Sequence, residues 1–239
     1  MKILSFDTLA STNQYCELLD LPKTEEFTIV WTQRQTAGVG QKGNHWDSEP
    51  FKNLTFSIVL HPTFLPPARQ YLLTKVLALG ISDFLLRHTQ QVKIKWPNDI
   101  YVDSKKICGI LVTNHIGKQF DTAICGIGLN IHQTQFPDWI PNPISLKQIT
   151  QQDYDLQKVL IQVVSDIKHR YEQLRHAALQ EINSDYWERL LYRNEKHKYL
   201  YLGLYIEATI IGITDFGHLI LRCEEGHTLN CHLKELTFL

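Results

Sequence analysis

The sequence of 239 residues predicts an α+β fold, with a main domain over residues 1–192 and a small β domain over residues 193–239. Three strand-like segments follow one another between residues 92 and 131, and a segment with helical periodicity lies on either side of them. After about residue 192 the pattern changes to short strands separated by glycine-containing turns. These observations favour a sheet flanked by helices, followed by a separate small β-barrel or β-sheet module.

The first ninety residues predict two helices and two strands around one long loop. Ser11 and Gln14 match a capping box, in which a hydroxyl is followed three residues later by an amide. The polar, glycine-rich residues 34–53 show no period, and loops of that length inside compact domains are usually functional or mobile. The expected elements are a helix from Ser11 to Leu19, strands over 27–31 and 54–60, and a helix from Pro66 to Leu85.

The rest of the chain predicts an antiparallel meander, a long amphipathic helix and the β module. The first two strands of the meander are joined by a turn at residues 103–105, and a proline-rich loop over 132–144 follows the third. The expected elements are strands over 92–102, 106–113 and 122–131, a helix from Leu156 to Leu174, and strands over 199–213, 218–223 and 227–232.

Composition excludes several classes of protein. The 24 basic and 25 acidic residues give a net charge of −1, which argues against general binding to nucleic acid or membrane surfaces. No apolar run approaches the roughly 20 residues that span a bilayer, and the first residues do not form a signal peptide. The 5 cysteines are scattered and form no CxxC pair, so we expect buried thiols in a reducing cytoplasm and no contact with a membrane.

Residues Gly38–Gly43 match the letters of the dinucleotide-binding pattern GxGxxG, but its structural context is absent. No helix follows the glycines, and positions 56–66 contain no acidic residue that would bind a ribose. Two interpretations remain: a flexible loop whose backbone N–H groups approach an anion closely, or a plain surface loop.

Three further clusters allow either a purely structural or a functional interpretation. Lys95–Asp99 is either a capped turn or a polar site, with Lys95 for phosphate charge and Asp99 for a metal or a base edge. Lys106 lies either on a solvated face or at the edge of a cleft, and Gly126–Asn130 is either close strand packing with an Asn cap or part of a site. Histidines at metal spacing, HExxH, a Walker A loop and GxSxG are all absent.

Taken together and in order, these clusters resemble the biotin protein ligases, also called biotin–[acetyl-CoA-carboxylase] ligases. The resemblance rests on Ser11–Asn13, Gln35–Trp46, Lys95–Asp99 with Lys106 and Gly109, and Gly126–Asn130. It implies a class II synthetase-like mixed β-sheet flanked by helices and a small C-terminal SH3-like β-barrel. It also implies the short form of the family, without an N-terminal helix-turn-helix, and hence no binding to DNA.

The resemblance implies a two-step reaction. Biotin and ATP with Mg²⁺ give biotinyl-5′-AMP, and the biotinyl group then passes to one lysine of a biotin carboxyl carrier domain. A ligase for lipoate or octanoate and a non-catalytic biotin-binding relative remain as alternatives. The identity of the carrier, the general base of the second step and the oligomeric state stay open, although family members often pair as homodimers through the sheet.

The resemblance also assigns roles to individual residues, with Lys106 as the central catalytic cation and Asp99 as a ligand of Mg²⁺. The biotin-binding residues are Ser11, Thr12, Asn13, Gln35, Gly38, Val39, Gly40, Gln41, Lys106 and Gly109. The residues for ATP and the adenylate are Lys42, Trp46, Lys95, Asn98, Asp99 and Asn130. The loop departs from the arginine-rich family pattern at Val39, Gln41 and Asn44, and we expect Val39 in place of an arginine to weaken retention of biotinyl-AMP.

Overall fold

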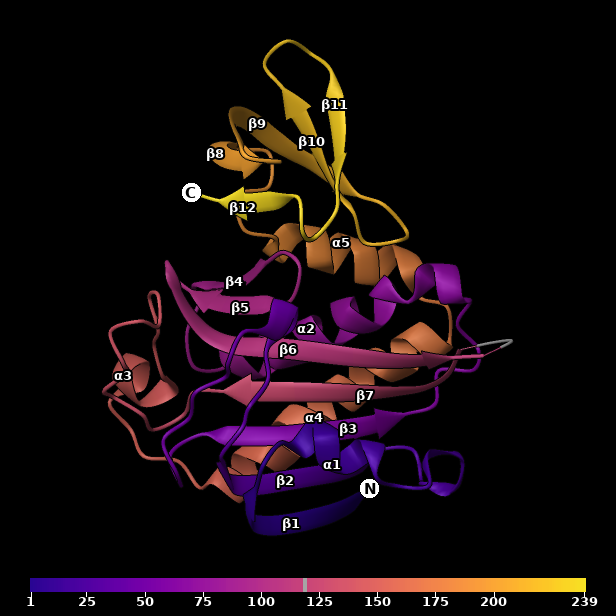
Figure 1. Ribbon diagram of the computed structural model, residues 1–239, viewed down its shortest axis with the longest axis vertical. Helices are drawn as coiled ribbons and strands as arrows, with labels where there is room; N and C mark the ends of the chain where they lie inside the picture. Colours follow the sequence, from indigo (N-terminus) through magenta and orange to yellow (C-terminus); the bar gives the residue numbers. More distant parts are fainter. Residues whose placement is uncertain (118–119) are drawn as a thin grey trace.

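Two β-sheets and three long helices make up the molecule (Figure 1). The computed structural model describes residues 1–117 and 120–239, except for the side chain of Lys42. The larger sheet has seven strands in the order β1-β2-β3-β7-β6-β5-β4, and only β1 and β2 pair in parallel. Its strands are β1 (Lys2–Leu9), β2 (Thr28–Gln35), β3 (Leu54–Leu60), β4 (Val92–Lys95), β5 (Asp99–Val102), β6 (Lys105–Ile116) and β7 (Phe120–Leu129).

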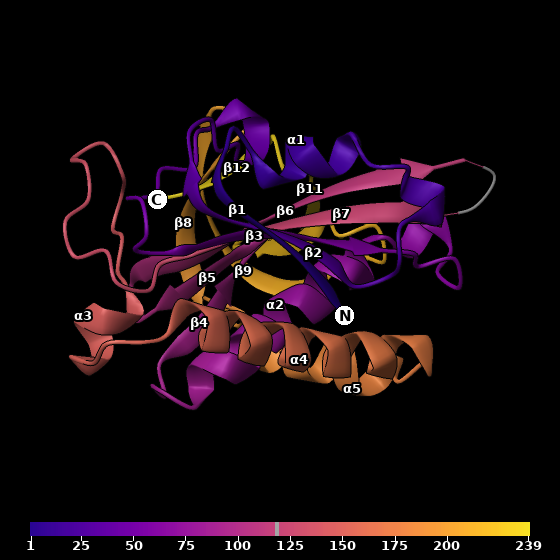
Figure 2. The same cartoon turned by 90° about the horizontal axis from the view of Figure 1, so that it is seen from below.

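Helices cover both faces of this sheet, as the view along it shows (Figure 2). One face carries α2 (Tyr71–Leu86), α4 (Leu156–Arg175) and α5 (Leu179–Arg189), while the short α1 (Thr12–Glu17) packs on the other face against β2, β3 and β7. All seven residues of β3 are buried because the strand is central and covered on both sides. At Gly80 a Cβ would lie 2.6 Å from the Cα of Ile167, so the glycine allows α2 and α4 to pack closely.

The second sheet lies beyond the β4 edge of the first (Figure 1). Its order is β11-β10-β9-β8-β12, and every neighbouring pair is antiparallel. The strands are β8 (Lys196–Tyr201), β9 (Leu204–Ile213), β10 (Leu219–Cys223), β11 (Thr228–Cys231) and β12 (Leu236–Phe238). The predicted β module is confirmed. Among the residues described, β11 and β12 are the two edges of its sheet and do not pair with each other, so the expected closed barrel is not confirmed.

The predicted meander and the two long helices are confirmed, with several differences in detail. The strand-like segment over 92–102 is broken at Pro97, as expected of a proline within a strand: a turn at Trp96–Asn98, with a cis Trp96–Pro97 bond, separates β4 from β5. The expected strand over 199–213 divides into β8 and β9, because Leu202 and Gly203 take positive φ angles of 49° and 85° and make a tight hairpin turn. The helix expected from Pro66 begins as a 3₁₀ turn at Pro67–Arg69, and α2 follows it.

The sequence did not predict β1, β12, α3 (Leu146–Thr150) or α5. The cysteines are free thiols, four of them buried, as expected. Within the described ranges, no helix is both long and apolar enough to cross a membrane.

Candidate active site

A cavity of about 240 Å³ lies where α1, the loop after β2, the β4–β5 turn and strands β6 and β7 meet. It brings together residues that are far apart in the sequence, as the resemblance predicted. Twelve predicted residues line it: Ser11, Thr12, Asn13, Gln35, Val39, Gly40, Gln41, Trp46, Asn98, Asp99, Lys106 and Gly109. Gly38, Lys95 and Asn130 lie outside the lining, and the predicted side chain of Lys42 falls outside what the structure describes.

The floor of the cavity is built from glycines on two paired strands. Gly109 of β6 pairs with Gly128 of β7. Gly126 lies two residues before Gly128 on the same strand. The Trp46 side chain lies directly over this pair, because a Cβ at Gly128 would collide with the indole and one at Gly109 would lie 3.0 Å from it. A Cβ at Gly126 would collide with the side chain of Asn13. The missing side chains therefore let Trp46 and Asn13 approach the sheet.

One end of the cavity is a buried network of hydroxyl and amide groups. Gln35 accepts a hydrogen bond of 2.9 Å from the backbone N–H of Thr12 through its side-chain oxygen. Ser57 Oγ on β3 lies 2.7 Å from Thr12 Oγ1 and 2.5 Å from Asn13 Oδ1. Ser11 caps α1 by accepting from the N–H of Gln14, which confirms the predicted helix start. The network positions neutral donors and acceptors and contains no ionised side chain.

The other end carries an ion pair. Lys106 Nζ lies 2.8 Å from Asp99 Oδ2 and 5.7 Å from the centre of the Trp46 ring. A β-bulge positions it: the register shifts so that Cys108 pairs with Ile100 and Lys106 with Tyr101, which leaves Ile107 unpaired. The backbone of Lys106 also bonds to the loop after β7, donating to Asn142 O and accepting from the N–H of Ile144. The lysine is therefore fixed at its backbone while its ammonium group reaches into the cavity.

Three other predicted residues lie around this end of the cavity: Asn98 in its wall, and Lys95 and Asn130 outside the lining. Asn98 is 7% exposed; its side-chain amide donates to the backbone carbonyl of Ile110, and its backbone carbonyl accepts from the N–H of Ile110. Lys95 Nζ lies 5.2 Å from the Tyr101 ring and 5.1 Å from the Phe238 ring; burial lowers its pKa, with the Asp99 carboxylate opposing the shift. Asn130 donates 3.0 Å to Ile144 O and so holds the loop that bonds to Lys106.

Residues that the sequence prediction missed also line the cavity. Leu233, Leu236 and Phe238 reach it from the second sheet, and Thr55 lines it from β3. Ser57, which supports the polar end, follows Thr55 on the same face of an otherwise apolar strand, and this spacing of two was a usable signal. The apolar residues of the second sheet carried no comparable signal.

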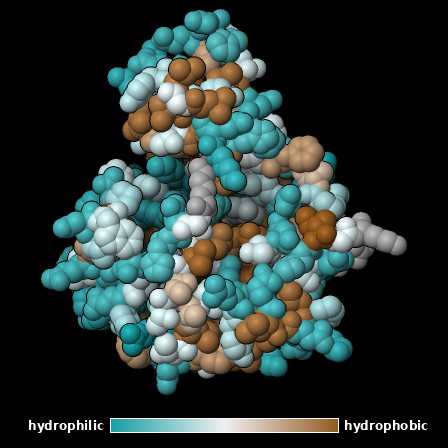
Figure 3. Space-filling model, viewed as in Figure 1, coloured by the Kyte–Doolittle hydropathy of each residue, from teal (hydrophilic) through white to brown (hydrophobic). Residues whose placement is uncertain are grey.

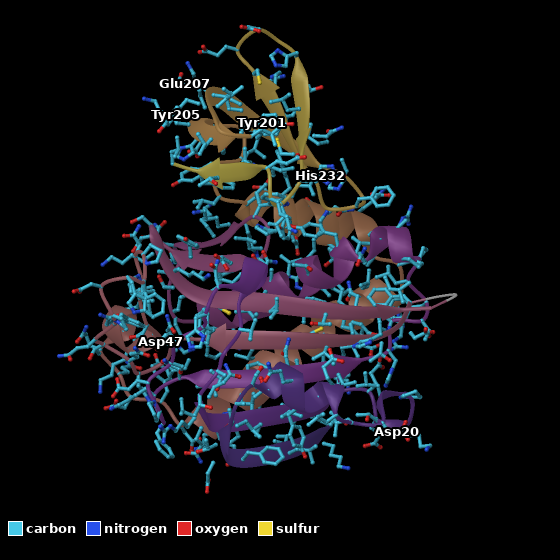
Figure 4. The ribbon with its side chains drawn as sticks, viewed as in Figure 1. Asp20, Asp47, Tyr201, Tyr205, Glu207 and His232 are labelled. Carbon is cyan, nitrogen blue, oxygen red and sulfur yellow. The ribbon has the colours of Figure 1, made fainter. Side chains whose placement is uncertain are left out.

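The surroundings of the cavity are visible from outside. Figure 3 shows a recess between the protruding second sheet and the larger body. A second cavity of about 600 Å³ adjoins the first beneath the second sheet and shares Gln41, Trp96, Pro97, Asn98, Ile110 and Leu233 with it. Figure 4 places His232, which lines this second cavity, at the base of the second sheet, and Asp47 on the outside of the larger body. Among the described residues, no group of three or more His, Cys, Asp and Glu side chains could hold a metal ion.

Comparison with known proteins agrees with this arrangement. Residues 5–130, more than half of the chain, match the model of the biotin/lipoate A/B protein ligase family. A bifunctional ligase/repressor BirA from Bacillus subtilis is 28% identical over 232 residues, which cover 94% of this chain and 70% of that protein. A biotin–[acetyl-CoA-carboxylase] ligase from Mycobacterium tuberculosis is 25% identical over 168 residues, covering 68% of this chain and 60% of that protein.

Solved structures show the same likeness. A biotin protein ligase from Aquifex aeolicus in complex with biotin and ATP superposes with a TM-score of 0.83 at 27% identity, covering 100% of this chain and 98% of that one. From the match over residues 5–130, we conclude that this chain belongs to the biotin/lipoate A/B protein ligase family.

Proposed function

We propose that this chain is an ATP-dependent biotin–protein ligase. It joins biotin to ATP as biotinyl-5′-AMP and passes the biotinyl group to a lysine of a biotin carboxyl carrier domain. The observation that carries this proposal is the division of one cavity into a neutral polar end and a charged end, with a glycine floor between them. The Aquifex neighbour, solved with biotin and ATP at 27% identity, supports the choice of both substrates.

In the first step an oxygen of the biotin carboxylate attacks the α-phosphorus of ATP. The bond from that phosphorus to the oxygen bridging it to the β-phosphate breaks, and pyrophosphate leaves. Two anions must approach each other, so a fixed cation between them stabilises both the bound substrates and the charge that develops in the transition state. We assign this role to Lys106, because its ammonium group faces the cavity and its backbone is held by two hydrogen bonds.

We assign the neutral polar end to the ureido ring of biotin. That ring offers one carbonyl and two N–H groups, which suit the hydroxyl and amide groups of Ser11, Thr12, Asn13 and Gln35. The glycines at 109, 126 and 128 let Trp46 and Asn13 lie close to the sheet, and the apolar part of the molecule would pack beside Trp46. The segment Gly38–Gln41 then covers the ligand from the loop.

At the charged end, we assign contact with the nucleotide to Asp99 and Trp46 and a wall position to Asn98. We assign to Lys42 a positive charge for the triphosphate, and to Lys95 a weaker contribution from outside the cavity lining. Asn130 supports the site by holding the loop at Ile144. Asp99 is the only carboxylate among the described residues that line the cavity. Mg²⁺ is usually bound by one or two carboxylates together with phosphate oxygens, so this donor set fits an ion that arrives with ATP. When bound, the ion supplies positive charge beside the phosphates, and Asp99 would hold it.

In the second step the neutral amine of the acceptor lysine attacks the acyl carbon. The carbon–oxygen bond to the phosphate breaks, AMP leaves, and the amine loses a proton. We propose residues 1–192 as the catalytic domain and residues 193–239 as the counterpart of the SH3-like module of the family. In this arrangement the module completes the cavity through Leu233, Leu236 and Phe238.

Biotin-dependent exchange of labelled pyrophosphate into ATP tests the first step. We expect exchange with biotin and none with lipoate or octanoate. Calorimetry that detects biotin binding in a protein that does not catalyse exchange would identify a non-catalytic relative and refute the proposal. Transfer is tested with labelled biotin and a carrier domain, with a Lys→Arg acceptor as the control.

A further inference from the structure

The turn between β9 and β10 contacts the β4–β5 turn of the larger sheet through one buried indole. Trp96 is 4% exposed, and its Nε1–H donates to the carbonyl of Gly217 at 2.9 Å. Gly217 has a φ of +89° and donates its own N–H to Thr214 O, which closes the turn. A Cβ at Gly217 would lie 2.5 Å from the Tyr71 ring, and a side chain would also be strained at that φ. Glycine is therefore required for the turn to rest on Tyr71.

Tyr71 also contacts the same β4–β5 turn from α2. Its hydroxyl lies 3.0 Å from Pro97 O and 2.8 Å from the hydroxyl of Tyr186 on α5. A carbonyl can only accept, so Tyr71 donates to Pro97 and Tyr186 donates to Tyr71. Burial raises the pKa of both phenols, so both keep the protons that these two bonds require. Pro97 is thus held by its carbonyl, and its neighbour Trp96 is held by its indole.

The two residues that follow Pro97 belong to the charged end of the cavity. Asn98 is bonded to Ile110 of β6 and Asp99 is paired with Lys106. A displacement of the turn at Trp96 and Pro97 would therefore move Asp99 relative to Lys106. None of the hydrogen bonds at the polar end, which join Thr12, Gln35 and Ser57, involves Tyr71 or the β9–β10 turn.

From these contacts we infer that Tyr71 and the turn Thr214–Gly217 act as a positioning device for the nucleotide end of the site. The second sheet and α2 hold Trp96 and Pro97, and through them place Asp99 against Lys106. This inference rests on the proposed function for its kinetic consequence, but the contacts themselves are independent of the reaction. Tyr71 is a positioning residue, because its hydroxyl reaches the site only through Pro97.

The test compares two tyrosine variants that differ in one hydrogen bond. Tyr71→Phe removes the donor to Pro97, whereas Tyr186→Phe leaves that donor in place and removes only the bond between the two hydroxyls. In pyrophosphate exchange, we expect Tyr71→Phe to lower kcat/KM for ATP about tenfold, the scale of one lost buried hydrogen bond, and Tyr186→Phe to change it less than threefold. Biotin affinity, measured by calorimetry without ATP, should stay within about twofold in both variants.

The inference would be overturned if Tyr71→Phe and Tyr186→Phe had the same kcat/KM for ATP. It would also be overturned if Tyr71→Phe lowered biotin affinity by the same factor as kcat/KM for ATP. Amide hydrogen exchange provides a readout that needs no activity. We expect faster exchange at the amides of residues 96, 98 and 99 and of residues 214–218 in Tyr71→Phe and Trp96→Phe, and unchanged exchange at residues 11–13. A natural protein without pyrophosphate exchange would refute the proposed function alone. Unchanged hydrogen exchange at the amides of residues 96, 98 and 99 in Tyr71→Phe and Trp96→Phe would refute the positioning device alone.

Discussion

The two ends of the cavity are built in different ways. At the polar end, Thr12 and Ser57 are 3% and 0% exposed, and they join a helix to the sheet on which it packs. At the charged end, the side chains of Lys106 and Asp99 are 29% and 22% exposed, and their surroundings come from the loop after β2, the loop after β7 and the second sheet. One end is formed between a single helix and the sheet on which it packs, whereas the other is assembled from separate loops and the second sheet.

This difference predicts an order of events. A site whose donors and acceptors are already fixed binds its ligand at little cost in ordering, so we expect biotin to bind in the absence of ATP. The loop from Gly38 to Trp46 forms a closed hairpin of its own, with Trp46 N–H bonded to Gly38 O and Gly40 N–H bonded to Asn44 O. We therefore expect it to respond to ligand binding as one unit.

The largest expected effect is at the charged end. Lys106→Ala should slow biotin-dependent pyrophosphate exchange by about 10²-fold or more, because it removes the one cation fixed in the described cavity wall. Lys105→Ala is the matched control, since Lys105 is exposed and adjacent in sequence, and its exchange rate should stay within about twofold. Normal exchange by Lys106→Ala would show that another group supplies the charge.

How far the sequence predicted the fold depended on burial. The long helices α2 and α4 were predicted because large apolar residues recur in their sequences with the helical period, although most of α2 proves to be buried and only α4 has a separate exposed face. β1 was missed because it is an edge strand with no fully buried residue, and α5 was missed because only Ile182 and Tyr186 are buried in it. Elements held mainly by partly buried contacts leave a weak pattern in the sequence.

The sequence predicted those site residues that lie in distinctive motifs and missed those that do not. Lys106 and Asp99 stand in clusters of unusual residue types, whereas Gln35 was expected only from the resemblance to the biotin protein ligases, and the structure brings all three to one cavity. Phe238 was missed because an apolar residue at the far end of the chain gives no sign of its neighbours, and only the packing of the second sheet carries it there. Lys95 was expected in the cavity, but its ammonium group lies between two aromatic rings.

A second effect should appear in stability, at the contact between α2, α5 and the second sheet. Lys75 is 8% exposed, its Nζ donates 2.7 Å to Asn183 Oδ1, and burial lowers its pKa to about 8, with Asp215 partly opposing the shift. Between that value and its ordinary value of 10.5, the unfolded chain binds more protons than the native protein. This residue therefore makes the fold more stable as pH rises through that window, by at most about 1.4 kcal/mol per pH unit.

Urea unfolding at pH 7, 8, 9 and 10 measures this contribution. Lys75→Met keeps the length of the side chain and removes the titrating group, so its stability should rise less between pH 8 and 10 than that of the natural protein. Parallel curves for the two proteins would mean that Lys75 does not titrate in that range.

Val39 provides a test of the loop between the two ends. Its side chain is 42% exposed and lines the cavity, at a position where the family pattern has an arginine. Val39→Arg adds a charge-assisted contact to the adenylate and should slow release of labelled biotinyl-AMP by roughly tenfold. Val39→Met, which adds length without charge, should release it at the natural rate. If both variants slow release equally, side-chain size rather than charge retains the intermediate.

The smallest expected effect is at the polar end. Ser57→Ala removes a hydroxyl that no ligand needs to touch but that orients Thr12 Oγ1 and Asn13 Oδ1. One neutral hydrogen bond contributes about 1 kcal/mol, so biotin affinity should fall by about fivefold, while the kcat of pyrophosphate exchange at saturating biotin stays unchanged. Ser82→Ala is the matched control, because Ser82 is also fully buried but bonds only to Ala78 O within α2. Calorimetry should give Ser82→Ala the natural affinity. If Ser57→Ala instead lowered kcat and left biotin affinity intact, the two ends would be coupled through β3, and the separation between them would be wrong.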